Sequence, residues 1–274
     1  MSQNRHLGIH AAVEAPLVPL GLGVPVMGLA DDHGPNRPIP PHRHDAAQLI
    51  HAASGVMKVR SEHGLWIVPP SRAVWVPAFA AHSIEMVGVV ALRTIYLAPE
   101  FARLEGDQCR VVQVSPLLRE GILRVIDFGP AYPPEGPEAN LAAVIRDELR
   151  TAEVEPLHLP TFSDERARRV AHAFEADPGD RRSRREWARV AGASERTLER
   201  LFHKDAGTSF GRWQRQVRLV RALEELAAGR SVTEVALDVG FETPSAFIAM
   251  FRAAMGTTPG RYFSQAGDRS EDRT

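Results

Sequence analysis

Histidine residues near the start of the chain have a spacing that suits metal binding. Eight of the 11 histidines lie at or before His82. His42 and His44 are two residues apart, so their side chains would point to the same face of a β-strand, and Gln48 keeps the same parity. Imidazole is a ligand that zinc, nickel and iron accept in proteins. These side chains form a first candidate site, for a divalent transition metal.

A second kind of chemistry is indicated by arginine residues in the last third of the chain. Arg196 and Arg200 are four residues apart and would share one face of a helix. A guanidinium can donate two hydrogen bonds to O6 and N7 of guanine. Residues 164–264 carry 18 Lys plus Arg against 14 Asp plus Glu, a net charge of +4, whereas the rest of the chain carries −5. A positive bias of this size fits contact with phosphate but is weak support by itself.

Both arginines lie in a stretch that the chain repeats. Ala188 and Gly192 recur 48 residues later as Ala236 and Gly240. Six more residues recur after 49 residues, namely Leu198, Phe202, Gly207, Thr208, Gly211 and Arg212, which match Phe247, Phe251, Gly256, Thr257, Gly260 and Arg261. Each copy has a short helix that ends near a glycine, a tight turn and a second helix, which is the pattern of a helix-turn-helix unit.

The start signals of these helices are local and specific. Ser194 can cap the second helix of copy one, and Thr243 with Pro244 can do so in copy two. Ser231 and Glu234 form a capping box before copy two. Apolar residues at helical spacing would face a small core, namely Leu198, Leu201 and Phe202, and in copy two Phe247, Met250, Phe251 and Ala254. The opposite face of each second helix is left free to contact a partner.

With its tail, GFETPSAFIAMFRAAMGTTPGRYF, this region of about 100 residues resembles the DNA-binding domain of the AraC/XylS family of bacterial transcription regulators. The resemblance implies two helix-turn-helix units on double-stranded DNA. The expected DNA-binding residues are Ser194, Glu195, Arg196, Thr197, Glu199, Arg200, His203, Thr243, Ser245, Ala246, Ile248, Ala249 and Arg252. Arg196 and Arg200 are candidates for base contacts, with phosphate contact as the alternative. Copy two has no long cation at the matching positions, which favours thymine methyl or phosphate contacts there, with Arg252 and Arg261 on phosphate.

The histidine region resembles the two motifs of the cupin fold, through PHRHDAAQ at 41–48 and PAFAAH at 77–82. In cupins a histidine pair, an acidic residue and a third histidine converge on a metal, which implies His42, His44, Gln48 and His82 here. Gln48 replaces the usual Glu, and Phe79 replaces the usual Gly. Because an amide lacks the charge of a carboxylate, three uses stay open: a metal site, a hydrogen-bonded group at the barrel mouth, or an organic effector pocket. Further effector contacts would be Arg43, Arg60, Trp66, Arg72 and Trp75, each of which could equally be a surface cation or a core aromatic.

Short β-rich runs between residues 24 and 114 predict hairpins broken at Ser54-Gly55, His63-Gly64, Pro69-Pro70 and Val87-Gly88. They favour a small β-barrel or sandwich. Two helices are expected between residues 115 and 150. The family resemblance implies a dimer contact for them, and packing on the chain's own barrel is the alternative. A connecting helix over residues 210–228 would be about 28 Å long, which approaches the spacing of about 34 Å between successive major-groove faces of B-DNA.

The sequence therefore predicts an α+β multidomain protein, with an N-terminal cupin-like β-barrel followed by an all-α domain whose two helix-turn-helix units are joined by a long helix. We expect a cupin-like sensor domain at 1–114, a helical dimerisation or linker region at 115–160, an AraC-type DNA-binding domain at 161–265 and a disordered tail at 266–274. A chain of 274 residues is long enough for two separate cores.

These features predict a sequence-specific transcription regulator whose cupin-like domain senses a small molecule or a metal. Activation and repression are equally compatible with the residues. The alternative is a metal-dependent cupin enzyme with a helical appendage, but Gln48 weakens that hypothesis. No Ser-His-acid set, phosphate loop or nucleotide fingerprint is present, so we expect no enzyme.

The expected partners follow from this function. They are promoter or operator DNA, a small-molecule or metal effector, RNA polymerase if the protein activates, and a second copy of the chain as a homodimer. No apolar stretch approaches about 20 residues, so no membrane is expected. The single cysteine, Cys109, permits no internal disulfide and favours the cytoplasm.

Overall fold

Two long antiparallel strands organise the N-terminal half. β4 (Ala47–Ser61) and β7 (His82–Leu97) pair from one end to the other in the computed structural model, which describes residues 17–267 apart from 19, 35–36, 103–107 and 156. β7 also pairs with β2 (Val26–His33) and β3 (Ile39–His44), whereas β4 pairs with β5 (Gly64–Val68) and β6 (Arg72–Val76). Most residues of β4 and all residues of β6 are buried.

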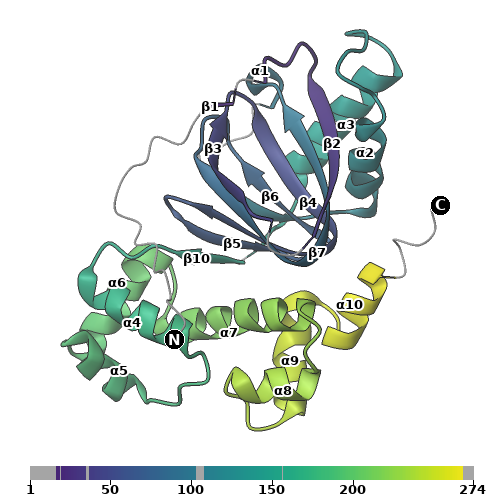
Figure 1. Cartoon of the computed structure of the whole chain (residues 1–274). Coiled ribbons are helices and arrows are strands. Elements are labelled where there is room, and N and C mark those ends of the chain that lie inside the picture. The colour runs from purple at the N-terminus through teal and green to yellow at the C-terminus, as the bar shows by residue number, and fades with distance from the viewer. Residues whose placement is uncertain (1–16, 19, 35–36, 103–107, 156, 268–274) are drawn as a thin grey trace.

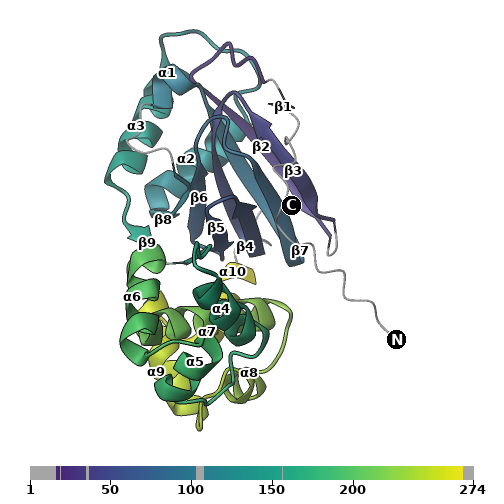
Figure 2. The same ribbon diagram turned by 90° about the vertical axis from the view of Figure 1, so that its left-hand side faces the viewer.

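Four short strands complete the sheet, namely β1 (Leu17–Val18), β8 (Arg110–Gln113), β9 (Val154–Glu155) and β10 (His158–Pro160). The strand order is β1-β3-β7-β4-β6-β8-β9, with β10 on β5 (Figures 1 and 2). Over the described residues the sheet is not closed into a barrel, so that part of the prediction is wrong, whereas the sheet-rich domain itself is confirmed. The physical reason lies at the two ends of the strand order: closure needs a ladder between them, and in the described residues β1 pairs with β3 and β9 pairs with β8, so both ends remain separate edges.

Two of the four expected hairpin breaks are bulges inside long strands. Gly55 has φ 80°, and the β4–β7 register shifts on both sides of Ser54. A Cβ on Gly55 would lie 2.3 Å from the carbonyl oxygen of Val89, so only glycine fits without a shift. Gly88, with φ 76°, lies within β7 in the same way. The breaks at 63–64 and 69–70 are confirmed as turns that precede β5 and β6.

Three helices accompany the sheet: α1 (Pro99–Ala102), α2 (Pro116–Ile126) and α3 (Pro137–Thr151). The apolar faces of α2 and α3 share a buried cluster with the sheet, as Leu118, Ile122 and Ile145 show. The backbone of β2 approaches α2 so closely that a Cβ on Gly28 would lie 2.6 Å from backbone atoms of α2. The two helices therefore pack on the chain's own sheet.

The C-terminal domain is helical. It contains α4 (Glu165–Ala176), α5 (Arg184–Ala191), α6 (Glu195–Ala206), α7 (Phe210–Ala227), α8 (Val232–Asp238), α9 (Pro244–Met255) and α10 (Pro259–Gly267). Figure 1 shows α5 and α6, the first unit, at one end of α7, and α8 and α9, the second unit, at the other. Two helix-turn-helix units joined by a long helix are thus confirmed. The predicted tail from 266 overlaps the end of α10, and its residues 268–274 lie outside the described residues, as does the N-terminal segment 1–16.

The two domains lie against each other (Figures 1 and 2). They share one continuous apolar core, and polar contacts also cross between them. The Tyr262 hydroxyl of α10 donates to the carbonyl oxygen of Pro70. Lys58 of β4 pairs with Glu224 of α7 at 3.6 Å, and Gln216 of α7 donates to a carbonyl oxygen of β10. The N-terminal domain therefore rests directly on the helix that joins both units.

Candidate DNA-binding surface and sensor site

In the first unit, the turn glycine and the cap of the second helix are the residues that the sequence predicts, and the structure adds a capping box at the start. Ser183 and Glu186 form a capping box at the start of α5, and Gly192 ends that helix in the left-handed conformation, with φ 63°. The Ser194 hydroxyl then accepts the backbone N–H of Thr197 at 3.2 Å and starts α6. These local hydrogen bonds fix the angle at which α6 leaves the turn.

An aromatic core holds α6 against the connecting helix. Phe202 on the inner face of α6 is fully buried. Its ring centroid lies 4.6 Å from that of Phe162 and 4.9 Å from those of Phe210 and Trp213. Because these contacts take up the inner face, the outer face of α6 is the one that remains available to a duplex.

The second unit is built in the same way with smaller residues. Ser231 and Glu234 form the expected capping box of α8, and Gly240 has φ 84° in the turn. Thr243 accepts the backbone N–H of Ala246 at 3.3 Å, with proline at the first position of α9. Phe247 is fully buried beneath α9. All of these signals were predicted from the sequence.

The outward faces of α6 and α9 differ in chemistry. In α6 the exposed residues include Glu195, Arg196, Arg200 and His203. In α9 the exposed residues include Ser245, Ala246, Ala249 and Arg252, and Ile248 is half-buried. A shallow groove on α9 is lined by Ser245, Ile248, Ala249, Arg252, Ala253 and Thr258. Figure 2 shows α6 and α9 on the same side of the helical domain, away from α4 and α8.

Several expected DNA contacts also have partners within the protein. Ser194, Thr197 and Thr243 take part in helix capping. The Glu199 carboxylate accepts the backbone N–H of Phe210 at 3.1 Å and pairs with Arg184 at 3.1 Å. Glu199 thus caps α7. Sequence reasoning missed this role because the partners lie 11 and 15 residues away, beyond the reach of a local capping pattern.

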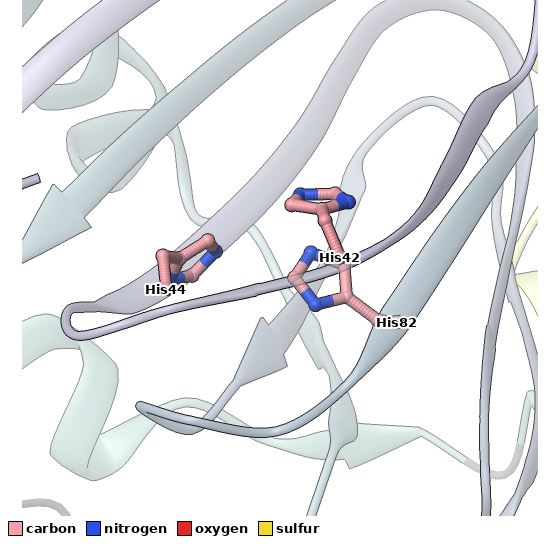
Figure 3. A group of neighbouring side chains, drawn as sticks. All are labelled: His42, His44 and His82. Atoms are coloured by element: carbon pink, nitrogen blue, oxygen red, sulfur yellow. The ribbon is translucent and has the colours of Figure 1, made fainter. Parts of the chain in front are cut away.

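In the sensor domain, three histidine side chains meet, as Figure 3 shows. The ring centroids of His42 and His82 lie 4.3 Å apart, and those of His44 and His82 lie 5.2 Å apart. His42 and His82 are register partners on β3 and β7, so the sheet brings the two cupin-like motifs together. The potential ligand atoms of the three rings lie within 4.8 Å of one another. His44 and His82 are buried, whereas His42 is half-buried.

Gln48 lies between two of these rings. Its Oε1 is 3.0 Å from Nε2 of His44 and 3.1 Å from Nε2 of His82. Its Nε2 donates to the Thr94 hydroxyl at 2.9 Å, and that hydroxyl donates to the carbonyl oxygen of Leu49. Thr94 is a member of the site that sequence reasoning missed, because its partner lies 46 residues away and no motif marks it.

The Nδ1 atom of each ring faces a backbone carbonyl oxygen two residues away. The distances are 3.0 Å for His42, 2.5 Å for His44 and 2.9 Å for His82. Burial lowers the pKa of His82 to about 3 and also lowers the pKa of His44. Both rings are therefore neutral at pH 7, and each carries its single proton on Nδ1 when it donates to the carbonyl.

Phe79 departs from the cupin pattern at a strained position. Its φ is 64°, in the left-handed region that favours glycine. Its backbone N–H donates to the carbonyl oxygen of His44 at 2.8 Å, and its side chain is 56% exposed. This bond ties the second motif to the first, and the positive φ gives a physical reason for glycine at this place in cupins.

The other candidate effector contacts occupy ordinary positions. Trp66 stacks on His158, and Trp75 packs in the core between the sheet and α2. Arg72 donates to the carbonyl and hydroxyl oxygens of Ser71. Neither tryptophan is available to a ligand, because both are at most 4% exposed. They act as core aromatics.

Comparisons with known proteins agree with both domains. A family model described as an AraC-like ligand binding domain matches residues 25–146, and one described as a helix-turn-helix domain matches residues 187–265. The HTH-type transcriptional regulator NimR of Escherichia coli K12 is 34% identical over 226 residues, which are 82% of each chain. The HTH-type transcriptional regulator RipA of Corynebacterium glutamicum is 37% identical over 123 residues, 45% of this chain and 35% of the relative. A solved AraC-type transcriptional regulator from Chromobacterium violaceum matches 37% of this chain and 91% of its own, with 27% identity and a TM-score of 0.35.

The fold and the two surfaces define a two-domain regulator, with a sheet-rich ligand-binding domain before a helix-turn-helix DNA-binding domain. The chain belongs to the AraC family of transcriptional regulators. The resemblance drawn from the duplicated tail is thereby confirmed. In the described part of the chain, no helix combines the length and the apolar character that a membrane span requires.

Proposed function

We propose that α6 and α9 enter two consecutive major grooves on one face of a duplex. The observation that carries this proposal is that α6 and α9 lie on the same side of the domain (Figure 2) and that each has a row of exposed residues. α7 has 18 residues. At ~1.5 Å per residue it is about 27 Å long, which suits grooves that recur about every 34 Å. One chain then covers about two helical turns.

Within this arrangement, Arg196 and Arg200 donate to guanine O6 and N7, because both are exposed on α6 and free of the core. On α9, Ala246 and Ala249 contact thymine methyl groups, and Arg252 contacts phosphate. Arg261, which is exposed on α10, is a second phosphate contact. The other expected residues have supporting roles. Helix caps involve Ser194, Thr197, Glu199 and Thr243. The edge of the major groove is the proposed place of Glu195, His203, Ser245 and Ile248.

Mapping of the bound genomic sites, followed by hydroxyl-radical footprinting, tests this proposal. The expected result is two protected stretches on one face of the duplex, about 10–10.5 base pairs apart. A single protected stretch, or two stretches on opposite faces, would overturn it. The same sites would also identify the neighbouring genes and so narrow the class of effector.

We further propose that the sensor site binds a divalent transition metal through Nε2 of His42, His44 and His82, with Oε1 of Gln48 beside them. Hydrogen-bond accounting supports this use. With Nδ1 protonated, Nε2 of His44 and Nε2 of His82 are acceptors, yet both face another acceptor, Oε1 of Gln48. The lone pairs of these two nitrogen atoms and of Oε1 of Gln48 would then face one another, and a cation bound among them would accept all three. Around an octahedral ion bound at about 2.1 Å, adjacent ligand atoms lie about 3.0 Å apart, which matches the two contacts of Gln48 with the rings.

The close contacts favour an ion over an organic effector at this point, because Oε1 of Gln48 is already within hydrogen-bond distance of both rings and leaves no room for a larger molecule between them. A bound metal would supply positive charge and hold β3, β4 and β7 together. We assign the site to sensing and not to turnover, since the neutral Gln48 stands where a cupin enzyme has a carboxylate.

Metal titration of chelator-treated protein, by calorimetry with Zn²⁺, Ni²⁺ and Fe²⁺, tests the metal proposal. One ion per chain is expected. His82→Ala should weaken binding at least about tenfold, and Gln48→Glu should strengthen it about tenfold because it adds a charged ligand. His63→Ala, which removes an exposed histidine in the turn between β4 and β5, should leave metal binding unchanged. If none of the three ions binds, the hydrogen-bonded alternative holds instead.

We also propose that two copies associate through the outer faces of α2 and α3. Leu117 and Val144 on these helices are 54% and 42% exposed, which is large for apolar residues. Leu117→Glu should shift sedimentation toward monomer, whereas Leu237→Glu, an equally exposed leucine on α8, should not. Unchanged sedimentation of Leu117→Glu would remove this interface.

The proposed setting is the cytoplasm, with RNA polymerase as a partner if the regulator activates.

A further inference from the structure

The loop between α4 and α5, residues 177–183, connects the two helix-turn-helix units a second time. It leads into the first unit, yet it contacts the turn between α8 and α9. A Cβ on Gly240 would lie 3.1 Å from the Cα of Gly179. A Cβ on Gly179 would lie 2.7 Å from the carbonyl oxygen of Asp238. Backbone meets backbone here, so neither glycine can gain a side chain without a shift.

Two further contacts hold this loop in place. Arg218, in the middle of α7, donates from Nε to the carbonyl oxygen of Pro178 at 2.9 Å and from Nη2 to that of Asp180 at 3.4 Å. Arg181 of the loop pairs with Glu242 of the α8–α9 turn at 3.6 Å. The loop is therefore fastened to the connecting helix and also touches the second unit.

A connecting helix alone would leave the two units free to swing. α7 is flanked by Gly207 and Gly229, both with positive φ, and such turns adjust more readily than a helix does. The added contact at Gly179 closes a triangle made by α7, the α4–α5 loop and the α8–α9 turn. A closed arrangement of this kind restricts rotation of one unit about the axis of α7.

We propose that the contact between Gly179 and Gly240 determines the spacing of the two half-sites that the regulator accepts on DNA. This inference rests on the proposed binding of α6 and α9 in consecutive grooves. Gly179, Gly240 and Arg218 are positioning residues, because they act through the reading helices without touching DNA. One added base pair turns the second half-site by about 34–36° around the duplex, which a fixed pair of units cannot follow.

The test compares three DNAs: the genomic site, the same site with one base pair inserted between its halves, and the half-site of α6 alone. Wild-type protein should lose about tenfold in affinity on the insertion. Gly179→Ala should bind the genomic site about tenfold more weakly and show almost no further loss on the insertion. Its affinity for the half-site of α6 should equal that of wild type, which a loss of folding would not allow.

Gly211→Ala is the matched control, because a Cβ on Gly211 would have no atom within 4 Å and its φ is ordinary. This variant should match wild type on all three DNAs. Arg218→Met is a second variant, which removes both hydrogen bonds to the loop and should reduce the insertion penalty in the same direction. It keeps the test decisive should Gly179→Ala unfold.

The outcomes separate this inference from the proposed function. If wild type protects two grooves but tolerates the insertion, the spacing role is wrong. It is equally wrong if Gly179→Ala and Arg218→Met retain the full insertion penalty. If wild type protects only one groove, the two-groove proposal is wrong, and the spacing role, which rests on it, is wrong as well.

Discussion

The two helix-turn-helix units share a backbone plan but present different chemistry. Each has a capped first helix, a left-handed glycine in the turn and a capped second helix. The outer face of α6 carries Arg196 and Arg200, whereas α9 carries Ala246 and Ala249. The duplication has thus kept the residues that fold the unit and changed those that face outward. We infer that one unit distinguishes bases by hydrogen bonds and the other by apolar contact.

The cores beneath the two reading helices also differ. Phe202 contacts three rings at centroid distances of 4.6 to 4.9 Å. In the second unit, Phe251 has ring neighbours at 5.9 and 6.0 Å, namely Tyr262 and Phe247. The first unit is therefore held by closer aromatic packing than the second.

The largest expected effect tests this difference in packing. Phe202→Ala should lower the free energy of unfolding by about 3–5 kcal/mol, a loss that includes the aromatic pairs at about 0.5–1.5 kcal/mol each. Phe251→Ala should cost less, because its ring contacts are longer. Urea denaturation followed by tryptophan fluorescence measures both. Phe79→Ala, at an exposed side chain, should be close to neutral. A larger loss for Phe251→Ala would reverse the comparison.

The next effect concerns the charged face of α6. Arg196→Ala and Arg200→Ala should each weaken binding to the genomic site by about 1–3 kcal/mol, the value of a bidentate contact to guanine. Ala249→Arg should weaken it less, because it adds a cation beside phosphate and removes only a small apolar contact. Fluorescence anisotropy at fixed salt measures all three. Wild-type affinity of both arginine variants would show that α6 does not read bases through them.

A smaller effect separates the apolar face of α9 from the charged face of α6. Replacing thymine by deoxyuridine removes a methyl group without altering base pairing. In the half-site of α9 each replacement at a contacted base should cost about 0.8 kcal/mol, the value of one buried methyl or methylene group. The same replacement in the half-site of α6 should cost nothing. Equal losses in the two half-sites would mean that α9 is not specialised for apolar contact.

Features set by residues a few positions apart could be predicted from the sequence. The capping box at Ser231 joins residues three apart, so the sequence contains the whole interaction; the box at Ser183 has the same form but was not predicted. The two reading helices and their buried faces follow in the same way. The placement of His42 and His44 on one face of their strand follows from their spacing of two residues alone. His82, by contrast, joined the candidate site only through the cupin resemblance.

Features that depend on distant partners could not be predicted. A glycine with positive φ serves a hairpin turn and a bulge equally well, so Gly55 gave no sign that β4 continues past it. Closure of the sheet depends on which distant strands pair, and no local pattern records that. Glu199 and Thr94 have partners in other elements, which explains why the first was expected on DNA and the second was not expected at all.

The smallest expected effect concerns phosphate contact by the second unit. Arg252 is exposed beside the groove of α9. If it neutralises one phosphate, Arg252→Gln should reduce the slope of log affinity against log salt by about 0.9 and weaken binding to all sequences by a similar factor. Arg150→Gln, at an exposed arginine on α3, is the matched control and should leave the slope unchanged. An unchanged slope for Arg252→Gln would mean that Arg252 makes no phosphate contact. A loss confined to one sequence would make it a base contact. Only a uniform loss fits a second unit that combines apolar reading with electrostatic anchoring.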